Sequence, residues 1–561
     1  MVSCHFSVPT PTSQFLKIAI TFSECQKGKV DFELPAWRPG RYELAPYADH
    51  IFRFQITDEK EKEISWVKTS PNVWSADNPK KQQLTLSYDY LANKMDAGNS
   101  FVDDMQVYIN FVNCVFYTQY SLSKPHDIQL DLPIDYMIAC ALGHEFTLQS
   151  KDFYELADSP LIASNRLNTM NYYVGESQFH IDIMGDCPLD EKSIIKEFRR
   201  FTEEQIELMG ESPTKDYRFL IQSLPYKHYH GVEHQNSTVL VLGPNTEEDK
   251  ETYRENLLGV ASHELFHAWN VCRIRPKEMS PYDFSKETIF ETGFAAEGFT
   301  TYYGDWFLKR SGVYDEAAYF KEVNILLQRH FMNPGRHESS LIQSSRNLWV
   351  NGYKKNPPSK EVSIYVKGAL ASLILDIHIR KTTQFKHSLL DLMIKMYERH
   401  RYDEGGYTKE DIYRLFDEIG GKSTLELAKR LYETTEDLQP LLESAFDQVG
   451  CLLTFKNHSS NLSSATGLLL EGATILEIAP ESPAYQQLIA GDKILEINGK
   501  EWSEKLDFET KEITLLVERA GRKAIAKVNI GEDTYWSTPV IENKKSPTVE
   551  QQKAKKDWLG A

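Results

Sequence analysis

One stretch decides the fold of the middle of this chain, and it reads Leu257-Leu258-Gly259-Val260-Ala261-Ser262-His263-Glu264-Leu265-Phe266-His267-Ala268-Trp269-Asn270. Its apolar residues recur on one face, which predicts a helix over residues 252–270. His263 and His267 stand four residues apart, so both imidazoles project from the same helix face. Two neutral imidazoles at that spacing can bind one Zn²⁺, and Glu264 beside them can take a proton from water. The stretch therefore predicts a zinc site with its own general base.

A catalytic zinc site uses three protein ligands and leaves one position open. The candidates for the third ligand are three downstream glutamates, Glu287, Glu291 and Glu297. The first two lie in a polar stretch that is typical of a loop, where a solvated acid is expected. Glu297 lies among small residues with helical period, and small residues allow a facing helix to come close. We therefore expect Glu297 to be the ligand, with Thr301 one turn later as its candidate support.

The hydrophobic pattern changes twice along the chain and predicts a multidomain α+β protein. Alternating apolar and polar residues dominate the first part, helical periodicity dominates the middle, and alternation returns after Gly450. The last stretch is polar and basic and is expected to be mobile. The expected parts are an all-β, sandwich-like domain over 1–170, an α-rich catalytic domain over 171–449, a β domain over 450–545 and a mobile tail over 546–561.

Composition excludes several classes of protein. With 41% hydrophobic residues the chain can bury a core, and 561 residues suggest three or four domains. The net charge of −18 argues against nucleic acid as a partner. No stretch is long and apolar enough to predict a membrane span, and the first residues do not form a secretory signal. The seven cysteines are scattered, without a C-x-x-C, which favours thiols in a reducing compartment. We expect a cytoplasmic protein, although a leader removed before this numbering would leave no trace.

Three regions of the sequence together resemble one protein family. H-E-L-F-H-A-W-N at 263–270, with E-G-F-T-T-Y-Y at 297–303, is similar to the glycyl aminopeptidase family of zinc metallopeptidases, which are gluzincins. P-A-W-R-P-G-R-Y at 35–42 resembles the signature of the family's N-terminal β domain, and G-D-K-I-L-E-I-N-G at 491–499 resembles its PDZ module. The resemblance implies a thermolysin-like catalytic domain and one zinc ion per chain. It also implies hydrolysis of the N-terminal peptide bond, with a preference for glycine or alanine. Cys272 stands where the family form has lysine.

The resemblance also implies roles for residues outside the zinc helix. Related enzymes bind the substrate's α-amino group with the glutamate of a Gly-x-x-Glu segment, and here Gly231 and Glu233 form a shorter Gly-x-Glu. A buried ammonium needs such a carboxylate, and Gly231 would let a substrate backbone approach. Tyr365 in Y-V-K-G-A would donate a hydrogen bond to the oxyanion. On the residues alone, Glu233 could equally be a solvated strand end and Tyr365 a core aromatic. Arg273 and Arg275 are expected to hold the helix end.

Two other functions stay open on the sequence. A metalloendopeptidase would use the same zinc site without the amine anchor, and a non-catalytic adaptor would bind peptides through the PDZ-like domain. The loop at 466–470 lacks the second glycine of the common carboxylate-binding form, so capture of a C-terminus there is expected to be weak, and the domain can instead contact the rest of the chain. Peptide substrates are the expected partners in either enzyme. The sequence does not give the oligomeric state or the physiological substrate.

Overall fold

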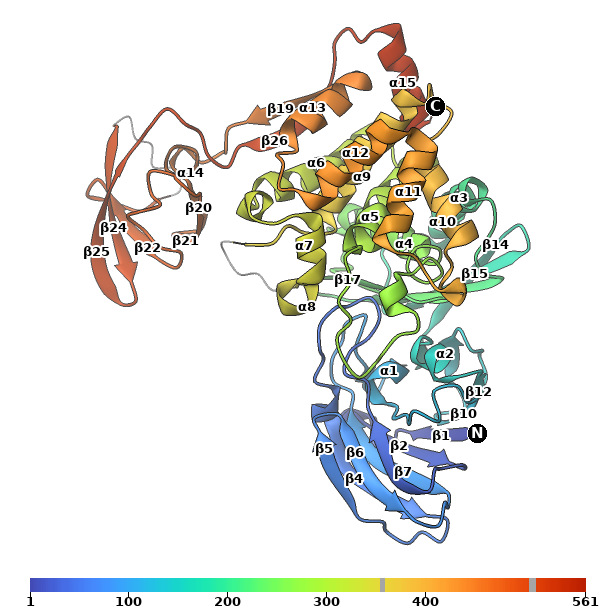
Figure 1. Cartoon of the computed structure of the whole chain (residues 1–561). Coiled ribbons are helices and arrows are strands. Elements are labelled where there is room, and N and C mark those ends of the chain that lie inside the picture. Colours follow the sequence, from blue (N-terminus) through green and yellow to red (C-terminus); the bar gives the residue numbers. More distant parts are fainter. Residues whose placement is uncertain (354–358, 504–510, 561) are drawn as a thin grey trace. The chain divides into compact units, whose positions relative to one another are not determined.

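The computed structural model describes residues 1–353, 359–503 and 511–560 of the chain (Figure 1). The chain forms two compact units, each assembled from separate segments. Unit 1 comprises Met1–Ile289, Tyr303–Val313 and Met393–Thr408, and unit 2 comprises Phe290–Tyr302, Tyr314–Leu392 and Lys409–Ala561. The multidomain α+β fold predicted from the sequence is confirmed, while its division at residues 170 and 449 stays a prediction.

The first part of unit 1 is rich in β-strands. A six-stranded sheet has the order β12 (Thr147–Ser150), β10 (His126–Asp131), β1 (Val2–Ser7), β2 (Phe15–Phe22), β7 (Leu84–Leu91) and β4 (Ile51–Asp58). A three-stranded sheet has the order β3 (Gly28–Glu33), β6 (Val73–Asn78) and β5 (Trp66–Ser70). A four-stranded sheet has the order β11 (Met137–Cys140), β13 (Leu161–Ser164), β9 (Val107–Ile109) and β8 (Phe101–Val102). Two short helices, α1 (Phe111–Cys114) and α2 (Phe153–Ala157), contribute to the same apolar core.

A five-stranded sheet in unit 1 supports the helix that carries His263 and His267. Its order is β14 (Asn168–Val174), β15 (Ser177–Met184), β16 (Asp216–Ser223), β18 (Ser237–Gly243) and β17 (His228–Glu233). The three strands β15, β16 and β18 run parallel, and β18 is buried along its whole length, as a covered parallel strand should be. β17 is the edge strand and pairs antiparallel with β18. Helix α4 (Lys250–His267) packs against helix α3 (Glu191–Met209) and against β17 and β18.

Helices dominate unit 2, and α9 (Val366–Thr382) is its centre. Nearly every residue of α9 is buried, which is typical of a helix covered by neighbours on all sides. The other helices of this part are α6 (Glu316–Phe331), α7 (Leu341–Arg346), α8 (Leu348–Asn351), α11 (Lys409–Gly420), α12 (Lys422–Glu433) and α13 (Gln439–Gln448). Two helices, α5 (Phe299–Arg310) and α10 (Leu389–Arg399), run from one unit into the other. Within the described ranges, no helix combines the length and the hydropathy that crossing a membrane requires.

A pair of glycines lets α9 cross the turn that carries Glu297. Residues Phe294–Gly298 form a π-helical turn that continues directly into α5. A Cβ atom on Gly298 would lie 2.6 Å from the Cα atom of Gly368, and one on Gly368 would lie 2.8 Å from the Cα atom of Gly298. Any side chain at either position would force the two backbones apart, because nothing flexible lies between them.

The C-terminal β domain is inserted into a two-stranded ribbon. Strand β19 (Cys451–Lys456) pairs antiparallel with β26 (Thr538–Asn543), from Cys451 opposite Asn543 to Lys456 opposite Thr538. Between them lie α14 (Asn461–Thr466) and a sheet of β20 (Leu468–Glu471), β21 (Thr474–Ile478), β22 (Lys493–Ile497), β24 (Glu512–Arg519) and β25 (Arg522–Asn529), with β23 (Lys500–Glu501) beside β22. The domain has its own apolar core. Its identity as a PDZ-like domain stays a prediction.

The expected mobile tail at 546–561 is wrong, because most of it forms helix α15 (Val549–Leu559). Thr548 caps this helix: its side chain accepts from the backbone of Gln551, whose side chain bonds back to the backbone of Thr548. Trp558 is 0% exposed, so the helix is fastened to its unit by a buried aromatic side chain. The polar composition of the segment concealed this anchor. The seven cysteines are free thiols, as the sequence predicted.

Candidate active site

Helix α4 holds both histidines of the H-E-L-F-H stretch, and Ser262 fixes its position within unit 1. The side-chain amide of Gln205 donates to the Ser262 carbonyl over 2.9 Å, and the Ser262 hydroxyl donates to the Gly304 carbonyl over 2.7 Å. A Cβ atom on Gly304 would lie 3.1 Å from the Cα and Cβ atoms of His263. Because few real Cβ atoms come so close, the approach of α5 to the backbone at His263 requires glycine.

The imidazoles of His263 and His267 face each other, with their Nε2 atoms 3.1 Å apart. The Nδ1 atom of His267 lies 3.1 Å from the carbonyl oxygen of Asn270. Because a carbonyl only accepts, Nδ1 carries the proton, and Nε2 of the neutral ring turns its lone pair toward His263. Tetrahedral zinc with bonds of about 2.0–2.1 Å keeps two nitrogens roughly 3.3 Å apart. The pair therefore fits one zinc ion with little adjustment.

Burial favours the form of this pair that binds metal. The pKa of His263 lies well below its ordinary value, first because burial penalises the charged ring and second because His267 would repel it. The ring is therefore neutral at physiological pH. Neutral imidazole is the form that binds a metal ion, so no proton has to be displaced from it.

Two carboxylates lie next to the imidazole pair. Glu264 of α4 and Glu233 of β17 are each 5% exposed. Ligand atoms of Glu233, Glu264 and His267 lie within 4.8 Å of one another. Gly231 makes this possible, because a Cβ atom there would lie 2.2 Å from Oε1 of Glu264 and 2.7 Å from Cγ2 of Val260. Two buried carboxylates this close attract a cation, so these three residues form an alternative set of metal ligands as well as a site for an ammonium group.

A loop of the N-terminal β region closes against Glu233. Gly40 has a φ of +77°, and a Cβ atom there would lie 2.5 Å from Oε2 of Glu233. The loop is anchored by Trp37, which is 0% exposed and donates its indole N–H to the Asp283 carbonyl over 2.7 Å. Gly40 is not among the site residues that the sequence predicts. The usable signal was the Pro39-Gly40 turn inside the 35–42 motif, but a turn signal does not name what the turn faces.

The other histidines near Glu233 have partners of their own. Nε2 of His230 lies 3.5 Å from Nη2 of Arg38, and burial together with that guanidinium lowers the pKa of His230 to about 3. Nδ1 of His234 lies 3.0 Å from Oδ1 of Asp158. Each ring is therefore contacted by a residue other than the predicted zinc ligands.

Arg273 and Arg275 hold the end of the zinc helix, as expected. Arg273 donates to the carbonyl of Ala268 over 2.7 Å and to the carbonyl of Gln235 over 2.8 Å. It thereby ties the end of α4 to the loop that follows Glu233. Arg275 donates to the carbonyls of Val271 and Cys272, each over 3.2 Å. The structure gives no role to the thiol of Cys272, which is buried and whose pKa burial raises well above its ordinary value.

Glu297 lies in the π-helical turn of unit 2 and is 2% exposed. Single π-helical turns inside α-helices are frequent at functional sites. The hydroxyl of Thr301 donates to the backbone carbonyl of Glu297 over 2.8 Å, which supports the helix but not the carboxylate. Of the other two candidates, Glu287 is exposed, and Glu291 is paired with Arg346 and, over 2.8 Å, with Lys409.

Tyr365 directly precedes α9 and is half-buried, which does not agree with a core aromatic. Its hydroxyl lies 3.4 Å from the hydroxyl of Tyr353. The neighbouring carbonyl of Ile364 would lie 3.0 Å from a Cβ atom on Gly298. Tyr365 and Glu297 therefore both lie next to the contact between Gly298 and Gly368 in unit 2.

The comparisons with known proteins point to one family. A model of the N-terminal domain of M61 peptidases matches residues 3–165, and a model described as M61 glycyl aminopeptidase matches residues 256–371. The second range contains His263, His267, Glu297 and Tyr365, whereas Glu233 lies outside both ranges. Among curated proteins, the sequence search finds no match.

The fold is also found in a solved structure. An aminopeptidase N family protein from Idiomarina loihiensis is 21% identical over 100% of both chains, with a TM-score of 0.90. At this identity the likeness shows a common fold and nothing about residue roles. An M1 zinc metallopeptidase from Deinococcus radiodurans is 14% identical over 78% of this chain and 94% of its own, with a TM-score of 0.48.

Gly231→Ala tests whether the edge strand shapes the position of Glu264. The added methyl would displace the carboxylate, which is the flexible partner in this contact. We expect hydrolysis of peptides to fall on the order of 10-fold or more, since general-base catalysis contributes about 10²–10⁴-fold. Metal content and thermal melting should stay near wild type. His228→Ala, on the same strand, is the control and should leave the rate unchanged. A wild-type rate for Gly231→Ala would contradict the assignment.

Proposed function

Because this chain belongs to the M61 family of glycyl aminopeptidases and is a zinc aminopeptidase, we propose that it cleaves the N-terminal peptide bond with one Zn²⁺ held by His263, His267 and Glu297. One observation carries the proposal. The Nε2 atoms of the two histidines face each other at 3.1 Å, and the carboxylates of Glu233 and Glu264 lie within 4.8 Å of His267. Ligand, base and amine anchor thus have the right chemistry at one place.

Helix geometry supports Glu297 as the third ligand. Glu297 and Gly304 stand seven residues apart on one continuous helical stretch, so they lie on the same face about two turns apart. Gly304 is the residue that meets the backbone of His263. The buried carboxylate of Glu297 is therefore our proposal for the ligand that completes the histidine pair. The alternative set of Glu233, Glu264 and His267 would leave His263 unused and would occupy both the base and the amine anchor.

The residues around the predicted metal have complementary tasks. Zinc in an open three-ligand site polarises a carbonyl and makes water acidic enough to attack near neutral pH. Glu264 takes the proton of that water and passes it to the leaving amine. The hydroxyl of Tyr365 donates to the oxyanion that develops on the scissile carbonyl. Burial of Glu264 suits this task, since a poorly solvated carboxylate accepts a proton more readily.

Glu233 makes the enzyme an exopeptidase in this proposal. Its buried carboxylate pairs with the free α-ammonium group of the substrate, because an ammonium without such a partner would be costly to bury. The loop at Gly40 stands against the same carboxylate, which leaves little space beyond the amine. This closure supports a substrate whose chain ends at Glu233, while the preference for glycine or alanine as first residue rests on the likeness to glycyl aminopeptidases.

The C-terminal domain is proposed to be PDZ-like. Its sheet ends in β20 at one edge, and Gly467 directly before β20 has a φ of +79°. A free strand edge is where such domains add an extended peptide. We expect weak capture of C-terminal carboxylates, because the loop has one glycine where two are usual. The cytoplasmic location stays a prediction from the cysteines.

Metal analysis of purified variants tests the ligand set. His263→Ala and Glu297→Ala should lose most of about one zinc ion per chain, as loss of one of three protein ligands requires. Glu264→Gln and Glu233→Gln should keep the zinc, because neither residue is a ligand, and Glu264→Gln should lose activity. Full zinc in Glu297→Ala together with loss in Glu233→Gln would identify the alternative ligand set instead.

Blocked and free substrates test exopeptidase action. We expect hydrolysis of glycine and alanine anilides with a free amine and none of their N-acetylated forms, which carry no charge for Glu233. Glu233→Gln should reduce kcat/KM for the free-amine substrates. The loss of transition-state stabilisation should be about 2–4 kcal/mol, the range for truncating one partner of a buried charge pair. The exposed Glu247→Gln is the control. Efficient cleavage inside a blocked peptide would support the metalloendopeptidase.

Tyr365→Phe tests the oxyanion donor with almost no change in packing. If Tyr365 donates to the oxyanion, kcat should fall by about 10²–10³-fold with little change in KM. Tyr173→Phe, at an exposed tyrosine, should leave both constants unchanged. Steady-state kinetics with a glycine anilide separates the two cases. A wild-type kcat with a lower melting temperature would mean that the tyrosine only packs.

A further inference from the structure

The chain returns to the helical part of unit 2 after its C-terminal β domain. The strands β19 and β26 leave and re-enter side by side, and β26 packs against α6 while β19 packs against α13. Helix α15 then follows and packs against α9 and α13 (Figure 1). The C-terminal β domain is therefore an insertion, and the last helix belongs to the helical part.

The end of α15 enters a buried polar network. The indole N–H of Trp558 donates to the hydroxyl of Tyr302 over 2.9 Å, and that hydroxyl donates to Oδ2 of Asp376 over 2.7 Å. Arg380 donates to the same carboxylate oxygen over 3.0 Å and to Oδ2 of Asp557 over 2.8 Å. Tyr302 is 3% exposed and Asp376 is 0% exposed. A buried carboxylate with this many donors is satisfied, and the network has one low-energy arrangement.

The network contacts the helical stretch that carries Glu297. Tyr302 stands five residues after Glu297, in the first turn of α5, and Asp376 and Arg380 stand on α9. The same α9 crosses the Glu297 turn at the two glycines. The hydrogen bonds of Tyr302 and the contact of Gly298 with α9 leave the helix that carries Glu297 little freedom to rotate or slide.

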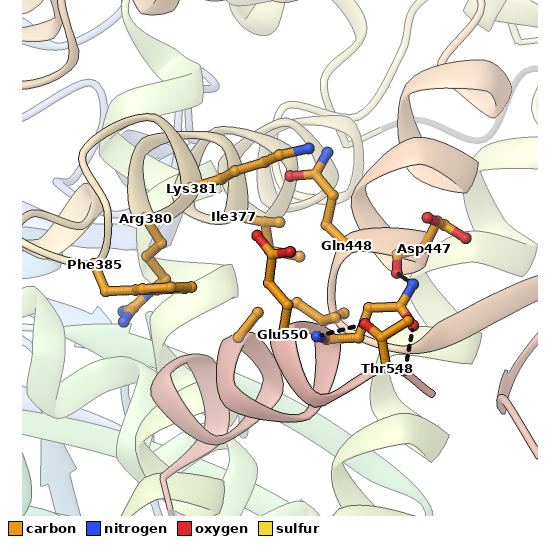
Figure 2. Close-up of a pocket in the computed structure, with 11 residues that line it drawn as sticks. Ile377, Arg380, Lys381, Phe385, Asp447, Gln448, Thr548 and Glu550 are labelled. Carbon is orange, nitrogen blue, oxygen red and sulfur yellow. Dashed lines mark hydrogen bonds between the residues drawn. The ribbon is translucent and has the colours of Figure 1, made fainter. Parts of the chain in front are cut away.

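Helix α15 is held at both ends and, between them, by Lys555, which pairs with Glu316 over 2.7 Å. A cavity of about 190 Å³ lies under its first turns (Figure 2). The residues that line it include Ile377, Phe385, Thr548, Glu550 and Gln551. At the start of the helix the Gln551 side chain donates to the Asp447 carbonyl over 2.7 Å, and at its end only Trp558 and Leu559 are buried. An eleven-residue polar helix is marginal by itself, so contacts with the rest of unit 2, among them those of Trp558, determine whether α15 stays in place.

We propose that Trp558 and Tyr302 are positioning residues for Glu297, so that the C-terminal helix sets the geometry of the zinc site. The proposal rests on the proposed role of Glu297 as a ligand. Residues that orient metal ligands typically change metal affinity or activity by about 10–100-fold when they are lost. Trp558 acts through the helix and not on the carboxylate, so its effect should be smaller.

The test uses the full-length chain with Trp558→Phe, Tyr302→Phe and the double variant. We expect each single variant to raise the zinc dissociation constant, measured by competition with a chelator, by about 3- to 10-fold. The visible spectrum of the cobalt-substituted protein should shift, and kcat should fall while KM stays the same. Trp558 and Tyr302 share one hydrogen bond. The loss of zinc-binding free energy in the double variant should therefore be smaller than the sum of the losses in the two single variants.

The matched control is Trp536→Phe. The indole nitrogen of Trp536 is buried without a hydrogen-bond partner in the part of the chain that the structure describes. This variant should keep the wild-type zinc affinity and cobalt spectrum. A lower melting temperature for Trp558→Phe with unchanged zinc affinity and spectrum would overturn the proposal, because the helix would then only stabilise the fold.

Glu297→Ala, measured alongside, separates this inference from the function on which it rests. If Glu297→Ala loses zinc while Trp558→Phe and Tyr302→Phe do not, the positioning role alone is wrong. If Glu297→Ala keeps zinc, the ligand assignment is wrong, and the positioning role is overturned with it.

Discussion

The site depends on one constraint: the two imidazoles of α4 must stay neutral and must point their lone pairs at the same place. The hydrogen bond from Nδ1 of His267 to the Asn270 carbonyl selects the tautomer, and burial keeps His263 uncharged. The rest of the arrangement follows from this pair. Carboxylates that would be unfavourable beside one another become useful once a cation lies between them.

Glycines determine how closely the surrounding elements approach the pair. Gly304 brings α5 to His263, Gly231 lets Glu264 pass the edge strand, and Gly40 lets the N-terminal loop meet Glu233. A Cβ atom at any of these positions would overlap a neighbour. The catalytic geometry is thus set largely by where side chains are missing, which is a property of backbone packing and not of the reactive residues.

The sequence predicts the local elements well where periodicity is strong. The helix predicted over 252–270 is found as α4, which differs from that range by a few residues at its ends. The π-helical turn at Glu297 was not predictable, because one extra residue in a turn barely changes the apolar period. The proximity of His263 and His267 was predictable because both come from one helix. The contact of Gly40 with Glu233 was not, since it joins segments far apart in sequence. Helix α15 was missed for a similar reason: the capping residues Thr548 and Gln551 were visible, but the burial of Trp558 depends on tertiary contacts.

Anomalous diffraction at the zinc absorption edge is the most direct test of the central claim. We expect one strong anomalous peak from zinc per chain, about 2.0–2.1 Å from Nε2 of both His263 and His267. A carboxylate oxygen of Glu297 should lie at about the same distance. A peak bound by Glu233 and Glu264 with His263 outside the coordination sphere, or no peak in zinc-loaded crystals, would contradict it.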